Sequence, residues 1–530
     1  MYEKVNAAKP DTIRAIAWPF ADNGKGGSNM LERLTSKSQH ARVGLFSIGH
    51  PHYWNQFAGL HDRLADYGHF IERRAGAWGE VHNFGMVDSP EKGRAAGEFF
   101  NSRNVDIVLC HAATYAMSAF VLPVFQRCKA PVVVLNLQPA ERMNYAKTTT
   151  GEWLAHCCAC CVPEVANALT RSGIPFHIVN GLLGLEETPA ISVANEVTCD
   201  RPEARNAWRE IEEWVRAAGV VRSLRGGRMG FLGHTYPGML DMYSDFTMIQ
   251  AQTGMHVEIV EMCDLARLVS SVMEEEKRTK QREVEEFFVI SEDSPSDPLA
   301  KKPKPEQLDW SCTVAAAQEK LVREFDLDAL TYYYRGAPGN EYERLQEAFI
   351  LGHSLLTARG VPCSGEGDMK TAVAMKICDL LGVGGSYSEL VATDFVDGTI
   401  LMGHDGPFHI AIADSKPILR GMGLYHGKWG SGVSVEAKVK CGPITTLGIT
   451  QTHAGKLKMI VNQGVATDGD ILRIGNTMTP VRFAMDPVSL MDAWFPMGPT
   501  HHFAMSVGHN ASQFKKVAAL LDWPFETACL

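Results

Sequence analysis

The sequence predicts an α/β protein with two doubly wound parallel-sheet domains followed by a C-terminal antiparallel β-barrel-like domain. Short apolar runs alternate with amphipathic segments up to about residue 388, and glycine-punctuated segments of alternating polarity follow. Alternating strands and helices are typical of parallel sheets covered on both faces, whereas β-rich tracts joined by turns are typical of barrels or sandwiches. A chain of 530 residues has room for two or three domains.

The N-terminal domain is expected over residues 1–225. Apolar runs at 41–49, 105–112 and 130–138 read as buried strands, and residues 52–68 have the spacing of an amphipathic helix. Strands followed by helices in this order are expected to form a parallel sheet.

The central domain is expected over residues 226–388 and begins at a Gly-Gly pair that opens a new strand. Its strands are expected at residues 226–234, 255–264 and 328–336. A long helix is expected to follow them at residues 340–360. Residues 274–310 are strongly charged, and we expect a solvated helix there, followed by a surface loop rich in Pro and Ser.

The C-terminal domain is expected over residues 389–530. Segments 432–451, 455–469 and 470–475 alternate polar with apolar residues and are separated by glycines. This pattern is typical of antiparallel strands that have one buried face, so we expect a barrel or sandwich.

Composition excludes several classes of function. The net charge of −10 and a pI near 6.0 argue against nucleic acid or an anionic membrane as a partner. The chain starts without an apolar leader and has no run long enough to span a bilayer, so a cytoplasmic location is expected. Thirteen cysteines then read as reduced thiols, and the run HCCACC at 156–161 reads as closely packed small side chains rather than a soft-metal or redox site.

Four residues towards the C-terminal end form a candidate metal site: Glu366, Glu389, His404 and His502. Each lies in a short segment that reads as the end of an element. Two carboxylates and two imidazoles suit Mn²⁺, Co²⁺ or Mg²⁺ with positions left for water or substrate. A site of this kind can polarise a carbonyl group while a carboxylate moves protons.

The order of the surrounding segments resembles the L-arabinose isomerase family and its relatives, the L-fucose isomerases. The segments are SGEGDMKTA at 364–372, SYSE ending at Glu389, Gly-His ending at His404, and His-His ending at His502. The resemblance implies that these four residues bind Mn²⁺, that Glu366 and Glu389 are catalytic, and that the chain has the three-domain layout. Fucose isomerases have Asp in place of the Glu of SYSE, and the interval to the Gly-His pair is shorter here than in arabinose isomerases, so Asp394 or Asp397 is an alternative to Glu389.

The same resemblance implies five substrate-binding residues. His156, in TGEWLAHCC, corresponds to a family histidine that reaches the substrate of a neighbouring subunit, and capping a helix is its alternative role. His111 ends an expected strand, where ligands of doubly wound sheets collect, or it is a satisfied loop histidine. His52 and Trp54 lie in GHPHYW after the first strand, and His501 precedes the last metal ligand.

The sequence therefore predicts a metal-dependent aldose–ketose isomerase that acts on a small-molecule sugar through a cis-enediol. The alternatives are a non-catalytic sugar-binding protein on the same fold, and a metal-dependent epimerase or aldolase. If His156 serves a neighbour's site, the active protein is a homo-oligomer, and the resemblance implies trimers pairing into hexamers.

Overall fold

The computed structural model describes residues 31–34, 40–292, 297–337, 339–422 and 430–530. The chain divides into two compact units, which we describe separately. Among the described residues, unit 1 contains residues 40–222, and unit 2 contains residues 31–34 and the chain from 223 onwards.

Unit 1 is built on a parallel sheet with the strand order β2-β1-β3-β4-β5. Its strands are β1 (Ala41–Ile48), β2 (Gly79–Val87), β3 (Ile107–Ala112), β4 (Val132–Gln138) and β5 (Phe176–Leu182). The expected strands β1, β3 and β4 are continuous apolar runs because they lie in the middle of the sheet. The sequence analysis missed β2 and β5, because these edge strands are only partly buried and lack such runs.

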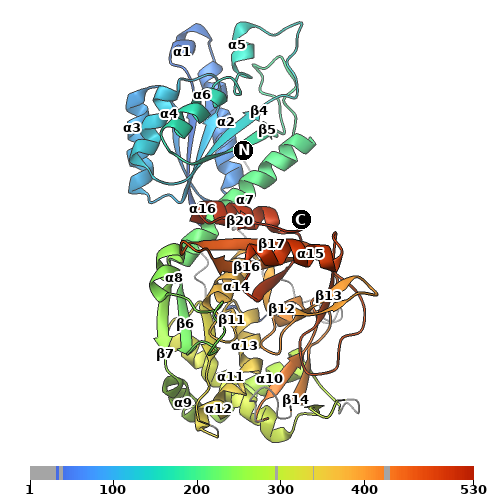
Figure 1. Ribbon diagram of the computed structural model, residues 1–530. Coiled ribbons are helices and arrows are strands. Elements are labelled where there is room, and N and C mark those ends of the chain that lie inside the picture. Colours follow the sequence, from blue (N-terminus) through green and yellow to red (C-terminus); the bar gives the residue numbers. More distant parts are fainter. Residues whose placement is uncertain (1–30, 35–39, 293–296, 338, 423–429) are drawn as a thin grey trace, which may run out of the picture. The chain divides into compact units, whose positions relative to one another are not determined.

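The described part of unit 1 also contains seven helices. They are α1 (His52–Gln56), α2 (Leu60–Ala75), α3 (Pro90–Ser102), α4 (Ser118–Arg127), α5 (Thr150–Leu154), α6 (Val162–Arg171) and α7 (Pro202–Arg225), the last of which runs on into unit 2. Helices α3, α4 and α6 share an apolar core with β1, β3 and β4, and Figure 1 shows α3 beside α4. The single helix expected at 52–68 is wrong, since Gly59 takes a left-handed conformation (φ 78°) and separates α1 from α2.

Unit 2 contains a second parallel sheet, with the strand order β11-β10-β6-β7. Its strands are β6 (Arg228–Gly233), β7 (His256–Val260), β10 (Ala329–Tyr333) and β11 (Cys363–Ser364). Helices α9 (Met262–Ser270), α11 (Pro305–Glu324) and α13 (Phe349–Ala358) supply apolar side chains to its core. Helices α8 (Phe246–Thr253), α10 (Glu274–Phe287) and α12 (Glu341–Gln346) complete this region.

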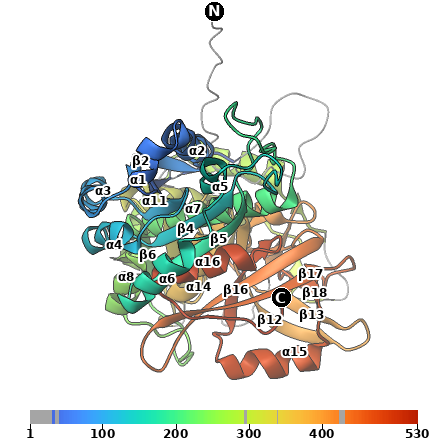
Figure 2. The same cartoon turned by 90° about the horizontal axis from the view of Figure 1, so that it is seen from above.

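Six antiparallel strands in the described part of unit 2 close into a barrel, in the order β16-β19-β12-β13-β18-β17, with β17 pairing back to β16. They are β12 (Gly384–Asp394), β13 (Thr399–Gly403), β16 (Gly442–Gln451), β17 (Leu457–Ala466), β18 (Thr479–Phe483) and β19 (His502–Val507). Figure 2 shows β13, β17 and β18 close together in this barrel. A mixed α/β fold with parallel sheets and a C-terminal antiparallel barrel is thus confirmed.

A small sheet lies outside the barrel. Strand β14 (Ile418–Met422) pairs with β15 (Val433–Glu436), β8 (Val289–Ile290) and β9 (Ala300–Lys301). The part of the charged segment 274–310 that follows α10 is therefore not a plain surface loop, because β8 and β9, which lie in it, add short strands to this sheet. The expected strand at 470–475 is also wrong, since the chain forms β18 further on, and the expected boundary between residues 388 and 389 falls inside β12. The division into three domains stays a prediction.

Helix α14 (Met369–Leu381) positions the candidate site. Every residue of α14 is buried, and the helix contacts both the barrel strands β12, β16 and β19 and the parallel-sheet strands β10 and β11. Asp368 caps its first turn by accepting from the Thr371 backbone N–H at 3.0 Å, and Gly382 (φ 72°) ends it. The segment just before α14 is therefore held where the two parts of unit 2 meet.

The remaining elements of unit 2 are α15 (Pro487–Trp494), α16 (Ala511–Leu521), β20 (Phe525–Glu526) and the 3₁₀ turns Ile410–Ile412 and Phe495–Met497. Strand β20 pairs with β17 in parallel. Among the described helices, none combines the length and the apolar composition that crossing a bilayer requires.

Candidate metal centre

The structure brings together the four predicted ligands, which come from four separate segments of unit 2. The candidate ligand atoms of Glu389, His404 and His502 all lie within 4.8 Å of one another, and those of Glu366, His501 and His502 do so as well. The two groups share His502. We call these five side chains the carboxylate–histidine cluster.

Glu366 is placed by a tight loop between β11 and α14. It has a left-handed backbone (φ 62°), and its carbonyl oxygen accepts from the Tyr236 backbone N–H at 2.9 Å. Gly367 follows, also left-handed (φ 73°), and a Cβ there would lie 2.6 Å from the Thr235 Cα. The small residues around Glu366 are therefore required by the close approach of a second loop.

Barrel register places the other three predicted ligands. Glu389 on β12 pairs with Gly403 on β13 on one side and with His502 on β19 on the other. His404 comes directly after Gly403, and its backbone N–H donates to the Thr477 hydroxyl at 2.8 Å. Glu389 lies in the middle of β12 rather than at the end of an element, so that part of the sequence interpretation is wrong.

Two aspartates hold the two adjacent histidines. His502 is fully buried, and its Nδ1 lies 3.1 Å from Asp368 Oδ2 and 2.7 Å from the Tyr387 hydroxyl. His501, 35% exposed, places Nδ1 2.6 Å from Asp241 Oδ2, and this oxygen also accepts from the His501 backbone N–H at 3.0 Å. Carboxylates that bond the second nitrogen of a ligating histidine are a common feature of metal sites.

The two glutamates are unfavourable as a charged pair without a cation. Burial raises the pKa of Glu366 to about 7, and the negative charges of Asp405 and Glu389 add to the shift. Burial, with a contribution from Asp405, also raises the pKa of Glu389. A bound divalent cation would remove this penalty by favouring both carboxylates in the ionised form.

Histidine protonation in the cluster follows the surroundings of each ring. Burial lowers the pKa of His502, which keeps the imidazole neutral and able to donate a lone pair. At His501 burial opposes the charged form, but the hydrogen bond and charge of Asp241 outweigh it, so the pKa of His501 is raised. The hydrogen bond from His501 in turn holds the pKa of Asp241 well below its usual range.

The residues fit a divalent cation. Glu366 Oε2 is buried and has no hydrogen-bond partner among the described residues, although it lies 3.6 Å from His502 Nε2. Carboxylate oxygens combined with imidazole nitrogens suit several divalent ions, including Mn²⁺, Co²⁺ and Mg²⁺. The cluster is therefore a candidate metal centre whose donor set is compatible with each of these ions.

The other four predicted site residues lie in unit 1, and none of them is part of the carboxylate–histidine cluster. His52 is exposed on α1, and Trp54 donates its indole N–H to Asp88 at 2.9 Å. His111 is buried at the end of β3, 2.9 Å from the Ser47 hydroxyl, and burial lowers its pKa to about 4.

His156 lies beside a buried ion-pair network that the sequence analysis missed. Its Nδ1 is 2.9 Å from the Glu152 carbonyl oxygen, and its Nε2 has no hydrogen-bond partner among the described residues. Glu152, Glu196 and His156 have the spacing of a ligand group, but Arg63 pairs with both carboxylates. Because Arg63 bonds to both carboxylates and the Tyr67 hydroxyl also donates to Glu196, we interpret this group as an ion-pair network rather than a second metal centre.

Of the four cysteines that follow His156, Cys157, Cys158 and Cys161 are buried and Cys160 is exposed. Cys158 and Cys161 belong to the core shared by α4 and α6, and burial raises the pKa of Cys158 to about 11. Thiols in this state are neutral, so they are poor metal ligands.

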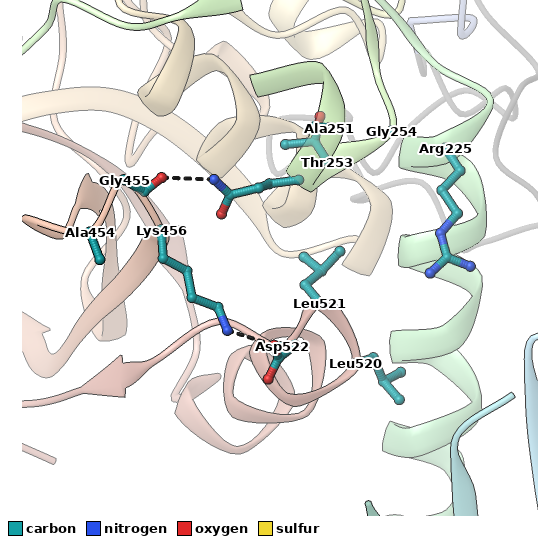
Figure 3. Close-up of a pocket in the computed structure, with 11 residues that line it drawn as sticks. Arg225, Ala251, Thr253, Gly254, Ala454, Gly455, Lys456, Leu520, Leu521 and Asp522 are labelled. Atoms are coloured by element: carbon teal, nitrogen blue, oxygen red, sulfur yellow. Dashed lines mark hydrogen bonds and ion pairs between the residues drawn. The ribbon is translucent and has the colours of Figure 1, made fainter. Parts of the chain in front are cut away.

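Two concave regions lie apart from the cluster. One, of about 550 Å³, has a Gln252–Gly455 hydrogen bond and a Lys456–Asp522 ion pair at 2.5 Å along its wall (Figure 3). The other, in unit 1, measures about 310 Å³ and is lined by Met143, Tyr145, Thr148, Thr149, Thr150 and Trp153. Neither lining includes any of the five cluster side chains.

Asp241, Asp405 and Tyr387 contact the cluster and were not predicted from the sequence, and Asp368 was not among the predicted site residues. Asp368 lies two residues after Glu366 in the same motif, so the motif carried a signal for it. Asp241 is 260 residues from His501, and no local spacing points to it. No protein-family model matches the sequence, and a search of curated proteins finds no match either.

Proposed function

We propose that the protein is a metal-dependent aldose–ketose isomerase of carbohydrate metabolism, similar to the L-arabinose and L-fucose isomerases. The observation that carries the proposal is that Glu366, Glu389, His404 and His502, from separate segments, fall into two ligand groups that share the buried His502. These four residues would hold the ion, with Mn²⁺ as the first choice and Co²⁺ or Mg²⁺ as alternatives. When bound, a divalent cation supplies a Lewis acid that stabilises negative charge on the substrate's carbonyl oxygen.

The two glutamates would carry the proton transfers. One carboxylate takes the proton from C2 of the open-chain aldose, and the other gives a proton to O1, which produces the cis-enediol. The O2 proton is then removed and a proton is returned to C1, so that the carbonyl group ends at C2 and the ketose is formed. Burial raises the pKa of Glu366 and so makes this carboxylate a better base, and a bound cation would oppose the shift.

The remaining assignments follow the resemblance. His501 would contact the sugar from the exposed side of the cluster. His52, Trp54 and His111 would contact the sugar, and His156 would contact the sugar in the site of a neighbouring subunit, within a homo-oligomer of trimers or hexamers. We also take each parallel sheet as doubly wound, and the protein as cytoplasmic with no nucleic-acid or membrane partner.

A screen of aldoses with Mn²⁺ present, monitored for ketose, tests this function. We expect turnover of at least one aldose, and a loss of about 10²-fold or more in kcat for both Glu366→Gln and Glu389→Gln, because each removes a proton-transfer group. The matched control is Asp394→Asn on the same strand. Near-full turnover in both glutamine variants would contradict the mechanism.

The same assay in D₂O separates the alternatives. An isomerase exchanges the C2 proton with solvent and forms a ketose, an aldolase also breaks a carbon–carbon bond, and an epimerase returns an aldose of altered configuration. A sugar-binding protein shows binding without exchange.

A further inference from the structure

His501 and His502 are adjacent residues with the same arrangement around the imidazole ring. In each, Nδ1 faces an aspartate oxygen, at 2.6 Å from Asp241 for His501 and at 3.1 Å from Asp368 for His502. In each, Nε2 faces Glu366 Oε2, at 4.0 Å and 3.6 Å respectively. His502, a ligand of the proposed metal centre, and its neighbour His501 are thus held in the same way.

The aspartate determines which nitrogen of His501 is available. An ionised carboxylate only accepts hydrogen bonds, so Nδ1 of His501 must carry the proton. In the neutral ring the lone pair is then on Nε2, the atom that faces Glu366. The same Asp241 oxygen accepts from the His501 backbone N–H, so the main chain and the ring are held by one group.

Asp241 comes from a different part of the chain. It lies between β6 and α8, whereas His501 directly precedes β19 of the barrel. Both side chains are about one third exposed, at 35% for His501 and 36% for Asp241. A partly exposed imidazole would sample several rotamers, and Asp241 restricts it to one that faces the cluster.

We propose that Asp241 is a positioning residue that makes His501 a further nitrogen ligand of the divalent ion in the substrate-free protein. This inference rests on the proposed metal centre, and it goes beyond the resemblance, which assigns His501 to the sugar. A purely structural role for the pair, as an ion pair that fastens the 234–245 loop to the barrel, predicts no effect on metal affinity.

The experiment measures the Kd for Mn²⁺ without any sugar, from the EPR signal of free Mn²⁺. We expect His501→Ala and Asp241→Asn each to raise the Kd about 10- to 100-fold, the range typical when a group supporting a metal ligand is lost. Because Asp241 acts through His501, the double variant is expected to bind no more weakly than His501→Ala alone.

Asp245→Asn is the matched control. Asp245 lies in the same loop and caps α8 by accepting from the Met248 backbone N–H at 2.8 Å. Asparagine caps a helix about as well as aspartate, so the same charge change should leave the Kd within about twofold of the wild type. Asp241→Glu, which keeps the charge, is expected to recover part of the affinity.

A Kd for Asp241→Asn within twofold of the wild type, or additive losses in the double variant, would overturn the inference. If Asp241→Asn does not fold, Asp241→Glu and His501→Ala decide it, since an unchanged Kd in His501→Ala excludes this ligand. Failure of this inference can be told apart from failure of the proposed function. Tight Mn²⁺ binding without ketose formation rejects the isomerase function and leaves the metal centre in place. A wild type that binds no Mn²⁺ rejects the metal centre and this inference together.

Discussion

Glu389 on β12 lies directly opposite His502 on β19. The two residues are 113 positions apart, and their proximity depends on the register of the barrel. A slip of one residue would turn the Glu389 side chain to the other face of the sheet and away from the histidine. The barrel is therefore the scaffold of the candidate metal centre, and metal binding is expected to stabilise it.

Mn²⁺ should raise the thermal stability of the wild-type protein. At a concentration of about 100 times its Kd, a ligand that binds only the folded state adds about 2.7 kcal/mol. We expect a rise of several degrees in Tm, measured by differential scanning fluorimetry, and little rise in Glu389→Gln.

Asp394→Asn is the control for this prediction, because Asp394 is one of the two alternative ligands, with Asp397, that the sequence left open. In the structure Asp394 accepts from the Val396 and Asp397 backbone N–H groups in the turn after β12. Its variant should keep the full shift. An equal rise in Tm with Mn²⁺ in Glu389→Gln would show that Glu389 does not bind the ion.

Glu366 is strained, and relieving the strain should stabilise the metal-free protein. A left-handed conformation costs about 1–2 kcal/mol for a residue with a Cβ, and glycine avoids most of this cost. Since Glu366 has a φ of 62°, we expect Glu366→Gly to unfold with a free energy about 1 kcal/mol higher than Glu366→Ala. Both variants lack the carboxylate, so urea unfolding of the pair isolates the strain. Equal or greater stability of the alanine variant would disprove it.

Acid should destabilise unit 2 through His353. This histidine is fully buried against Tyr332 and Phe349, and burial lowers its pKa to about 3 from 6.5. Between these two values the unfolded chain binds a proton that the folded chain excludes, so stability falls as the pH falls.

The expected loss from this residue between pH 6.5 and pH 4.5 is about 2–3 kcal/mol. Urea unfolding at the two pH values measures it, and His353→Leu should show a correspondingly smaller difference. Some acid sensitivity should remain, because burial also lowers the pKa of His409 to about 4. An unchanged pH dependence in His353→Leu would show that the imidazole is not the group responsible.

A site shared between subunits should allow two inactive variants to complement each other. Glu366→Gln removes a cluster residue, and His156→Ala removes the residue expected to serve a neighbouring site. Oligomers assembled from both chains would contain some sites with neither change, so mixing them should restore part of the ketose formation. Mixed oligomers, verified by mass spectrometry, that stay inactive would reject the shared site, as would full activity in a monomer.

Local sequence patterns determined the types of many elements. Strands β1, β3 and β4 were predictable because a central strand of a parallel sheet needs an uninterrupted apolar run, which is visible in the sequence. Edge strands such as β2 and β5 were not, because partial burial leaves no such run.

Glu366, Glu389, His404 and His502 could be named as candidate ligands from the sequence, because the motif segments that carry them are short and contiguous. Their surroundings could be seen only in the folded chain: Asp241 at His501, Asp368 and Tyr387 at His502, and the pairing of β12 with β19 that places Glu389 beside His502. The ion pairs of Arg63 with Glu152 and Glu196 could not be predicted from the sequence either. The physical reason is that periodicity and motifs record interactions between near neighbours in the chain. A contact between residues 260 positions apart depends instead on the path of all the chain between them.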